Sequence, residues 1–497
     1  SVTSLTVEPS QWDGAGNMSL SEVAFYEYDG LADEIEALFA NDSHTVLAQG
    51  VDAERIAALR TKAENVDAYY VERSVLLDQL ENAQQILNGE TLVVRSGFTS
   101  RSGAADQKYG QTASALQPLG ITALSNQSVS FYVEGLGDGE AATLVQWQQY
   151  SEAGTEAKRY TLHNGRNQIY LNPIGNSGSG ERGGSLYLEY SGSHADEIKL
   201  QIRDISAQKN VVTEIPLLDI TSDQWYGRSA EERKAQIAAY VETLRTYVSG
   251  LTFPNDSSRR TNIRNATEIA TPSVLLSLPA DQVLAGLGGA QASTEEMTQK
   301  LYDAICAWEQ LLFLANKTQG VIDGDAVFAD YRYPMETRQN IRFSRMFSGA
   351  FMFAAGSYVG IDYPETRSMV TGYPLGQNST GGGIDADDVN GLYGWGIAHE
   401  IGHNMDKIGY AEITNNIYSL VAQTADTGNM TGASRLEGMY TAIFDKVALG
   451  KPGQAGDVFT QLGMYWQLHL AYDEAGNPLD GAGALDFYNA FFAKWKA

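Results

Sequence analysis

The sequence predicts an α+β, multidomain protein with an N-terminal helical region at residues 1–90, a β-sandwich at 91–208 and a mainly α-helical domain at 209–497. Two observations lead to this prediction. A chain of 497 residues is long enough for two to four domains at roughly 100–200 residues per domain. The hydrophobic pattern also changes twice, from helical spacing to short strand-like runs and then back to helical spacing.

The composition is typical of a globular protein and excludes several classes of function. Hydrophobic residues make up 43% of the chain and charged residues 19%, far from the composition of disordered sequences. The 34 Lys and Arg residues against 61 Asp and Glu residues give a formal net charge of −27. Such a negative surface disfavours binding to nucleic acids and to anionic membranes. The single cysteine, Cys306, excludes an intrachain disulfide and a zinc site built on cysteine pairs.

The first element is a small helical region. Over residues 31–87 apolar residues recur at spacings of three and four, as at Ile35, Leu38 and Phe39. This periodicity predicts about three helices. The pair Asn88-Gly89 then ends the helical pattern.

Short β-rich runs fill the next segment. Apolar and aromatic residues gather over a few positions at a time, and turn residues such as Gly and Asn separate the runs. This pattern predicts about seven strands in a β-sandwich or barrel. The predicted strands are residues 92–94, 129–133, 144–147, 160–162, 168–171, 186–190 and 198–202.

Helical spacing returns from about residue 217. Ser229 and Glu232 form a predicted capping box before a helix that runs toward Val248. The rest of the chain alternates helical segments with loops, and it shows no repeat of solenoid length. The longest apolar run, from Met346 to Ile361, is shorter than the ~20 residues of a membrane-spanning helix, so we interpret it as buried core.

One short motif carries the chemistry. Of the six histidines, His399 and His403 stand four residues apart with Glu400 between them. On a helix these positions share one face, so both imidazoles can bind one metal ion while Glu400 lies beside its water. This HExxH pattern is the zincin motif and predicts a zinc peptidase. The alternative interpretation is two histidines on a solvated helix face.

Glu412 is the expected third zinc ligand. A catalytic zinc has three protein ligands and keeps a fourth position open. The metzincin branch is excluded because Asp406 and Gly409 occupy the positions of its Gly and third His. A gluzincin takes a Glu from the following helix, and Glu412 lies nine residues after His403. The catalytic domain is therefore predicted to be gluzincin-like, with Asp406 on the surface or beside a His nitrogen.

The residues around the motif resemble the M60, or enhancin-like, metallopeptidase family. The similarity is carried by the run from Trp395 to Asn404 and by the following run from Glu412 to Leu420. It extends over about residues 210–497, and the strand-rich segment before it resembles the β-sandwich that usually precedes this family's catalytic domain. Two more stretches match the family's texture, Gly372–Pro374 and Met464–Leu468.

The resemblance implies a Zn²⁺-dependent O-glycopeptidase. Members of the family from mucosal bacteria cut O-glycosylated proteins such as mucins next to a glycosylated Ser or Thr. A secreted or cell-surface bacterial enzyme without membrane insertion is therefore expected. One departure is Asp406, which stands where the family often has Gln. This position is not a ligand, so the departure bears only on local packing and on groups around the ligands.

Several residues are candidates for contact with substrate. A site that recognises a sugar needs an aromatic face and a few fixed polar groups. Arg435 is the only arginine after Arg367 and is the candidate glycan contact, with a surface ion pair to Glu437 as the alternative. The other candidates are Trp395, Tyr373, Asn415 and Asn416. The two asparagines could instead orient the His ligands or form helix caps.

Glu400 is the expected general base, which accepts a proton from water and passes it to the leaving amine. A tetrahedral oxyanion also needs a donor besides the metal. Tyr465 and His469 are the candidates, because they lie four residues apart in a helical stretch. The apolar character of that stretch leaves ordinary core packing as the alternative.

Glycines near the motif indicate close packing. Gly394, Gly396 and Gly402 each cost about 1 kcal/mol relative to Ala in a helix interior, so we expect another backbone or the substrate to approach there. The acidic segment Gly381–Asn390 resembles a calcium loop only superficially, and we interpret it as a flexible loop bordering the cleft.

Two other functions are compatible with the motif. One is a zinc peptidase without a glycan requirement, and the other is a glycan-binding adhesive module whose zinc site is structural. Structural zinc sites usually have four protein ligands, whereas this motif offers three and a base, which disfavours the adhesive module. We also expect a monomer, a signal peptide removed before Ser1, and an origin as an excised part of a longer protein.

Overall fold

The computed structural model of this chain divides into two compact units, Ser1–Glu90 and Thr91–Ala497, and each is described by itself. The division into three domains stays a prediction. The described residues are 30–67, 72–89, 93–101, 114–148, 157–174, 183–203, 211–332, 338–346, 349–376, 391–406, 408–428, 430, 433–450 and 457–496.

The N-terminal unit contains the helices that the apolar periodicity predicts. They are α1 (Leu31–Glu36), α2 (Ala53–Glu64) and α3 (Arg73–Leu87). Asp52 caps α2, because its side chain accepts a hydrogen bond from the backbone N–H of Arg55. Fully buried Ile35, Ile56 and Leu80, one from each helix, form part of a shared core.

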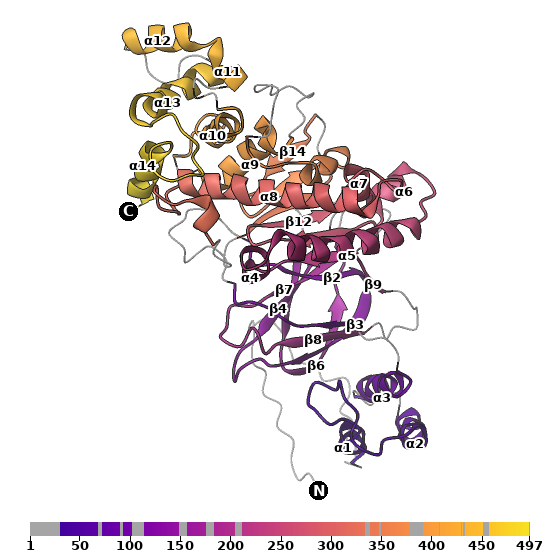
Figure 1. Cartoon of the computed structure of the whole chain (residues 1–497). Coiled ribbons are helices and arrows are strands. Elements are labelled where there is room, and N and C mark those ends of the chain that lie inside the picture. Colours follow the sequence, from indigo (N-terminus) through magenta and orange to yellow (C-terminus); the bar gives the residue numbers. More distant parts are fainter. Residues whose placement is uncertain are drawn as a thin grey trace, which may run out of the picture. The chain divides into compact units, whose positions relative to one another are not determined.

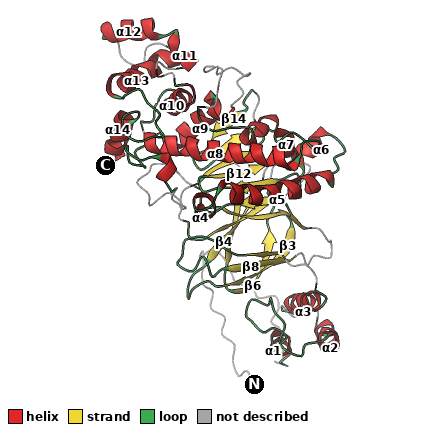
Figure 2. Ribbon diagram, viewed as in Figure 1, coloured by secondary structure: helices red, strands yellow, loops and turns green. Residues whose placement is uncertain are grey.

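The second unit begins with a β-sandwich, shown as the yellow strands around β3, β4, β6 and β8 in Figure 2. One sheet has the strand order β1-β8-β3-β6 and the other β5-β4-β7-β2-β9. Their facing sides enclose one core that includes Phe131, Leu144 and Leu188. The strands are β1 (Val93–Arg95), β2 (Gln117–Leu124), β3 (Gln127–Glu134), β4 (Ala142–Trp147), β5 (Ala157–Leu162), β6 (Gly165–Leu171), β7 (Gly183–Glu189), β8 (Lys199–Arg203) and β9 (Val212–Glu214).

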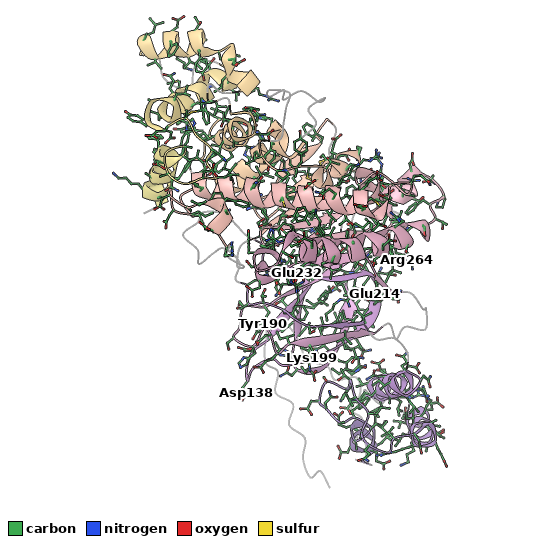
Figure 3. All side chains as sticks on the ribbon, viewed as in Figure 1. Asp138, Tyr190, Lys199, Glu214, Glu232 and Arg264 are labelled. Atoms are coloured by element: carbon green, nitrogen blue, oxygen red, sulfur yellow. The ribbon has the colours of Figure 1, made fainter. Side chains whose placement is uncertain are left out.

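Two sandwich strands, β2 and β9, are absent from the sequence prediction. In β2 the register shifts between Pro118 and Thr122, and Gly120 has a φ of +63°, so the apolar residues do not alternate regularly. Strand β9 pairs with β2 beyond residue 208, where the sandwich was expected to end. Glu214 of β9, labelled in Figure 3, forms an ion pair with Arg95 of β1 at 3.0 Å and so links the two sheets.

A six-stranded mixed sheet follows the sandwich, where the sequence analysis expected only helices and loops. Its order is β10-β11-β12-β13-β15-β14, and β14 lies at one edge. The strands were missed because they are three to five residues long and mostly buried, so they show no polar alternation. The α+β class is confirmed, and the third region, which is mainly helical, also contains this sheet, which was not predicted. The strands are β10 (Leu217–Asp219), β11 (Thr267–Ala270), β12 (Val274–Leu278), β13 (Gln339–Phe343), β14 (Met352–Ala354) and β15 (Val359–Ile361).

This sheet lies between a layer of helices and the sandwich; in Figure 1, β12 is seen between α8 and α5, and the sandwich strands lie below them. On the helical side, its residues share a core with α5 (Ala230–Ser249), α7 (Ala280–Gly286) and α8 (Thr294–Thr318). On the other side, the Tyr187 hydroxyl of the sandwich donates to Glu268 of β11 at 2.8 Å. The sandwich is therefore packed directly against the sheet.

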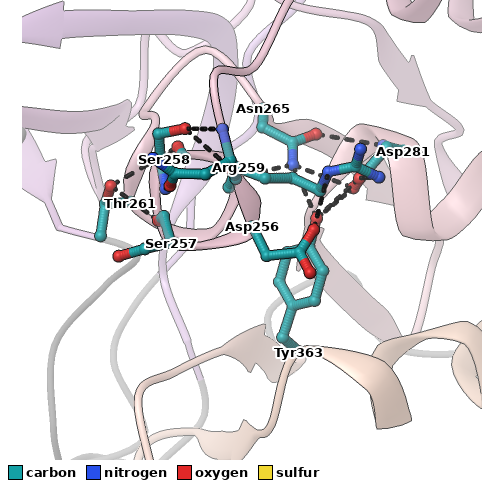
Figure 4. Close-up of polar contacts among 9 residues, drawn as sticks. Asp256, Ser257, Ser258, Arg259, Thr261, Asn265, Asp281 and Tyr363 are labelled. Carbon is teal, nitrogen blue, oxygen red and sulfur yellow. Dashed lines mark hydrogen bonds and ion pairs between the residues drawn. The ribbon is translucent and has the colours of Figure 1, made fainter.

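Capping boxes begin several of these helices. The predicted pair Ser229 and Glu232 caps α5, and the short helices α4 (Ser222–Tyr226) and α6 (Asp256–Thr261) also begin with capping boxes. The end of α6 is attached to α7 through the carboxylate of Asp281, drawn in Figure 4. It accepts hydrogen bonds from the Tyr363 hydroxyl at 2.7 Å and from Asn265 at 2.9 Å, and Arg259 lies 3.4 Å away.

The C-terminal part of the chain is helical and packs around its own core, which includes Trp466, Tyr488 and Phe492. No helix among the described residues is long and apolar enough to span a bilayer. The helices are α9 (Trp395–Met405), α10 (Asn416–Thr427), α11 (Ala433–Glu437), α12 (Tyr440–Ala448), α13 (Val458–Tyr472) and α14 (Asp486–Lys496), with 3-10 turns η2 (Phe328–Asp330), η3 (Pro364–Val370) and η4 (Gly391–Tyr393).

Candidate active site

Helix α9 carries the HExxH motif and is held between other elements. Its apolar residues Ile397, Ile401 and Met405 are buried in the core shared with α8 and the sheet. Gly402 faces α10 so closely that a Cβ atom there would lie 2.2 Å from the carbonyl oxygen of Asn415. The expected close approach of another backbone is therefore present at Gly402.

The structure brings His399, His403 and Glu412 together, with one ligand atom from each within 4.8 Å of the others. The two His Nε2 atoms are 3.1 Å apart, and the Glu412 carboxylate lies 3.3 Å from His399 and 3.1 Å from His403. Donor atoms bound tetrahedrally to zinc at about 2.0 Å lie about 3.3 Å from one another. The spacing and the chemistry of these three donors therefore fit a zinc ion.

Asp406 holds the loop that brings Glu412 to the histidines. Its carboxylate accepts from the backbone N–H groups of Ile408 at 2.9 Å and Gly409 at 3.3 Å, and from the Thr414 hydroxyl at 2.5 Å. Glu412 itself has a φ of +66°, a left-handed conformation that a non-glycine residue adopts only when its surroundings impose it. The expected position of Asp406 beside a His nitrogen is wrong, because the described hydrogen bonds of its side chain are all with residues of this loop.

Asn416 connects His399 to Glu412 beneath the site. Its Oδ1 lies 2.6 Å from Nδ1 of His399, and its Nδ2 donates to the backbone carbonyl of Glu412 at 2.7 Å. A proton on Nδ1 leaves the Nε2 lone pair of His399 directed at the metal position. Asn415 is also buried and donates to the backbone carbonyl of His399 at 3.3 Å. Their burial contradicts the predicted contact with substrate and supports the alternative, orientation of the His ligand.

Glu400 lies on the same helix as the histidines and is mostly buried. Burial raises the pKa of its carboxyl, although nearby His399 and a hydrogen bond with the backbone of Ala354 oppose this effect. A raised pKa suits a group that must accept and then release a proton near neutral pH. The contact with Ala354 also shows that edge strand β14 runs beside α9.

The two predicted oxyanion donors occupy different surroundings. Tyr465 is half-buried, and burial together with the neighbouring Tyr410 and Asp406 raises its pKa, which puts it beside the loop that holds Glu412. His469 is buried in the C-terminal core, with Nδ1 2.6 Å from Asp473. Its ring centroid is 4.2 Å from that of Trp466 and 5.9 Å from that of Tyr488. These contacts contradict a catalytic role for His469 and support a structural one.

The predicted substrate contacts Arg435 and Trp395 touch each other. The guanidinium of Arg435 lies 4.6 Å from the centroid of the Trp395 ring and 5.4 Å from that of Phe459. Trp395 is only 7% exposed, so its predicted role as a substrate contact is wrong, whereas Arg435 is exposed. Tyr373 is half-buried. Two residues later, the backbone N–H of Leu375 donates a hydrogen bond to the Gln310 side chain of α8, so this segment is attached to α8. The loop Gly381–Asn390 lies outside the described residues.

Sequence reasoning missed two features of this site. Asp406 was assigned no role in holding the loop, although an Asp followed by a Gly three residues later is a common turn signal. Edge strand β14 was also missed, because its three residues lie in the apolar run Met346–Ile361 and show no alternation. Only the folded sheet order reveals that it borders α9.

Comparisons with known proteins agree with this geometry. Residues 345–496 match the family described as Peptidase M60, enhancin and enhancin-like. The comparison with curated proteins gives no match.

Among solved structures, the CBM32-1, CBM32-2 and M60 catalytic domains of Clostridium perfringens ZmpB superpose with a TM-score of 0.63 at 19% identity, covering 95% of this chain and 44% of that one. A metallopeptidase from Bacteroides thetaiotaomicron gives a TM-score of 0.59 at 16% identity, and the match covers 96% of this chain and 69% of that one. The M60 catalytic domain of C. perfringens ZmpC in complex with the sialyl T antigen gives a TM-score of 0.54 at 19% identity, and the match covers 81% of this chain and 69% of that one.

These identities establish likeness of fold, and the chain spans less than half the length of the ZmpB structure. The family match covers α9, α10 and all three residues of the metal-ligand cluster. Residues 345–496 of this chain therefore match the peptidase M60, enhancin and enhancin-like family.

Proposed function

We propose that the protein is a zinc-dependent endopeptidase that cuts O-glycosylated, mucin-type proteins next to a glycosylated Ser or Thr. The observation that carries this proposal is the convergence of His399, His403 and Glu412 within 4.8 Å, with Glu400 on the same helix. The three donors and an adjacent base are the composition of a catalytic zinc site with an open position. A structural site would require a fourth protein ligand, and the described residues supply three.

The chain's own residues have separable roles in this reaction. A zinc ion held by the cluster would acidify a water molecule and polarise the scissile carbonyl. Glu400 accepts the proton of the attacking water and delivers it to the leaving nitrogen. Asn416 fixes the tautomer of His399, and Asp406 fixes the loop of Glu412. Tyr465, beside that loop, is the proposed hydroxyl donor to the tetrahedral oxyanion.

The edge strand β14 is the proposed docking strand for the peptide. It pairs with β15 on one side, and no strand among the described residues pairs with its other side. An extended peptide can add to such an edge through backbone hydrogen bonds. Because Ala354 of β14 contacts Glu400, a peptide aligned there passes next to the general base.

Glycan recognition rests on Arg435. Its guanidinium is exposed and held over the Trp395 ring, at the start of the helix that carries the motif. A guanidinium fixed in this way can donate hydrogen bonds to sugar hydroxyls or to a carboxylate. A solved M60 domain of similar fold was captured in complex with the sialyl T antigen, which supports a glycan ligand here.

We propose that the protein acts outside the cell and that it is a monomer.

The deciding experiment is mass spectrometry of mucin-type glycopeptides after incubation with the protein. We expect a single cut beside each glycosylated residue, loss of cutting with a chelator, and loss of cutting after enzymatic removal of the O-glycans. The Glu400→Ala variant serves as a control, because it should keep the zinc and lose the activity. Equal cleavage of glycosylated and deglycosylated peptides would contradict glycan dependence and indicate a general zinc peptidase.

A further inference from the structure

Phe351 is an exposed aromatic residue beside the catalytic helix. It directly precedes β14, and 56% of its surface is exposed, whereas Phe353 two residues later is buried. The backbone at Phe351 is fixed, because its carbonyl accepts a hydrogen bond from the N–H of Asp362 at 2.9 Å. An exposed phenylalanine on a fixed backbone has an apolar face available to a ligand.

The position of the Phe351 ring is defined by Gly396 in the first turn of α9. A Cβ atom placed on Gly396 would lie 3.6 Å from Cε2 of Phe351 and 3.2 Å from the sulfur of Met352. Residues 396 and 400 are four apart, so they share one face of the helix. The Phe351 ring therefore lies about one helical turn, roughly 5.4 Å, from Glu400 along the helix axis.

The position of Phe351 on the edge strand determines which part of a bound peptide it can contact. An extended peptide rises about 3.3 Å per residue. Phe351 stands three residues before Ala354, whose backbone contacts Glu400, so a peptide that passes Glu400 along β14 reaches Phe351 about three residues away from the bond that is cut. Phe has no hydrogen-bonding group, so the substrate atoms that it can stabilise there are apolar.

We propose that Phe351 is a specificity-determining residue that forms the apolar wall of a subsite for a nonpolar side chain of the peptide, about three residues from the scissile bond. This inference rests on the proposed peptidase function and adds a requirement on the peptide sequence to the requirement for a glycan. Gly396, half-buried and without a side chain, provides the floor of this subsite.

The test compares two glycopeptide series that differ only in having Leu or Ser at the positions about three residues from the scissile bond, on either side of it. The wild type is expected to prefer the Leu series by about tenfold or more in kcat/KM, as for a few methylenes in an apolar pocket. Phe351→Ala should lower kcat/KM for the Leu series to about that for the Ser series, and Phe351→Leu should partly restore the preference. The matched control is Phe444→Ala, because Phe444 on α12 is 58% exposed and lies outside the proposed site.

A binding measurement separates this inference from the proposed function. Dissociation constants for both peptide series are measured by calorimetry with Glu400→Gln and with the double variant Glu400→Gln, Phe351→Ala. Weaker binding of the Leu series alone in the double variant supports the subsite, even if the wild type cleaves neither series and the proposed activity fails. Equal loss in both series, or no loss in either, overturns the role of Phe351.

Discussion

The side-chain amide of Asn416 joins His399 to the loop of Glu412: its Oδ1 lies 2.6 Å from Nδ1 of His399, and its Nδ2 lies 2.7 Å from the backbone oxygen of Glu412. One side chain thus sets the orientation of a ring on α9 and the position of a carboxylate that precedes α10. These two ligands approach the metal position from different elements, so their geometry depends on this link.

Replacing Asn416 by Ala is expected to weaken zinc binding by roughly 10–100-fold, because hydrogen-bond partners of metal ligands contribute on this scale. Competition with a chromogenic chelator measures the affinity directly. Asn65→Ala is a suitable control, since Asn65 donates to a backbone carbonyl on an exposed helix of the N-terminal unit. Unchanged zinc affinity in Asn416→Ala would show that the loop and the ring hold their positions without this amide.

Asp406 should also affect the position of Glu412, through its hydrogen bonds with the loop that carries this ligand. Asp406→Ala removes an acceptor of three hydrogen bonds from the loop, so Glu412 loses its fixed left-handed conformation and zinc affinity falls. Asp406→Asn keeps one acceptor oxygen and should give an intermediate affinity. Asp445→Ala, at an exposed position on α12, should leave the affinity unchanged. Equal affinities for Asp406→Ala and the wild type would contradict the proposed role.

Glu268 should make stability depend on pH at the junction of the sheet and the sandwich. Burial raises its pKa to about 7, despite hydrogen bonds from Ser277 and Tyr187 and the nearby charge of Arg342. In the unfolded chain its pKa returns to 4.5, the ordinary value of a glutamate side chain. The folded state therefore binds the proton more tightly, and the stability present below pH 4.5 is lost as the pH rises through 7.

The expected loss between pH 4.5 and pH 8 is about 3 kcal/mol, from about 1.4 kcal/mol per pKa unit. Urea unfolding at a series of pH values measures it. Glu268→Gln should flatten this part of the profile, because the amide stays neutral. If the wild type and Glu268→Gln show parallel profiles, the pKa of Glu268 is not raised in the folded protein.

The metal cluster could be predicted from sequence because its ligands are local. His399 and His403 lie on one helix, and Glu412 follows within one loop, so periodicity and motif spacing suffice to bring them together. Seven strands of the sandwich could be predicted for a similar reason, since turn residues separate short apolar runs. The six-stranded sheet could not, because its short buried strands are indistinguishable from other apolar runs.

The predictions of substrate contact were wrong for the residues whose side chains are buried. Asn415, Asn416, Trp395 and His469 are residue types that suit a binding site, yet all four side chains are buried. Sequence spacing does not reveal which face of a helix meets another helix many residues away. Arg435 remained exposed because it lies on a short peripheral helix, and its guanidinium reaches back over Trp395.

Lys317 should be essential for attaching the C-terminal helices to α8. Its buried ammonium group donates to the backbone carbonyls of Ala326 at 3.1 Å, Pro478 at 2.9 Å and Gly481 at 2.7 Å. Lys317→Met leaves these carbonyls without their donor, and a loss of about 3 kcal/mol or more is expected. Urea unfolding followed by tryptophan fluorescence measures the loss. Lys300→Met on the same helix is the control, because Lys300 is exposed.

Gly402 offers the sharpest test of how α9 and α10 position the ligands. A methyl group in Gly402→Ala would meet the Asn415 carbonyl oxygen at 2.2 Å, well inside van der Waals contact, so the backbone before α10 must move. That movement displaces Asn416 and Glu412 together, and we expect zinc affinity to fall more than in Asn416→Ala. The control is Gly438→Ala, because a Cβ there meets no atom of the described part of the chain within 4 Å. A Gly402→Ala variant that keeps wild-type zinc affinity would show that this contact does not set the ligand geometry.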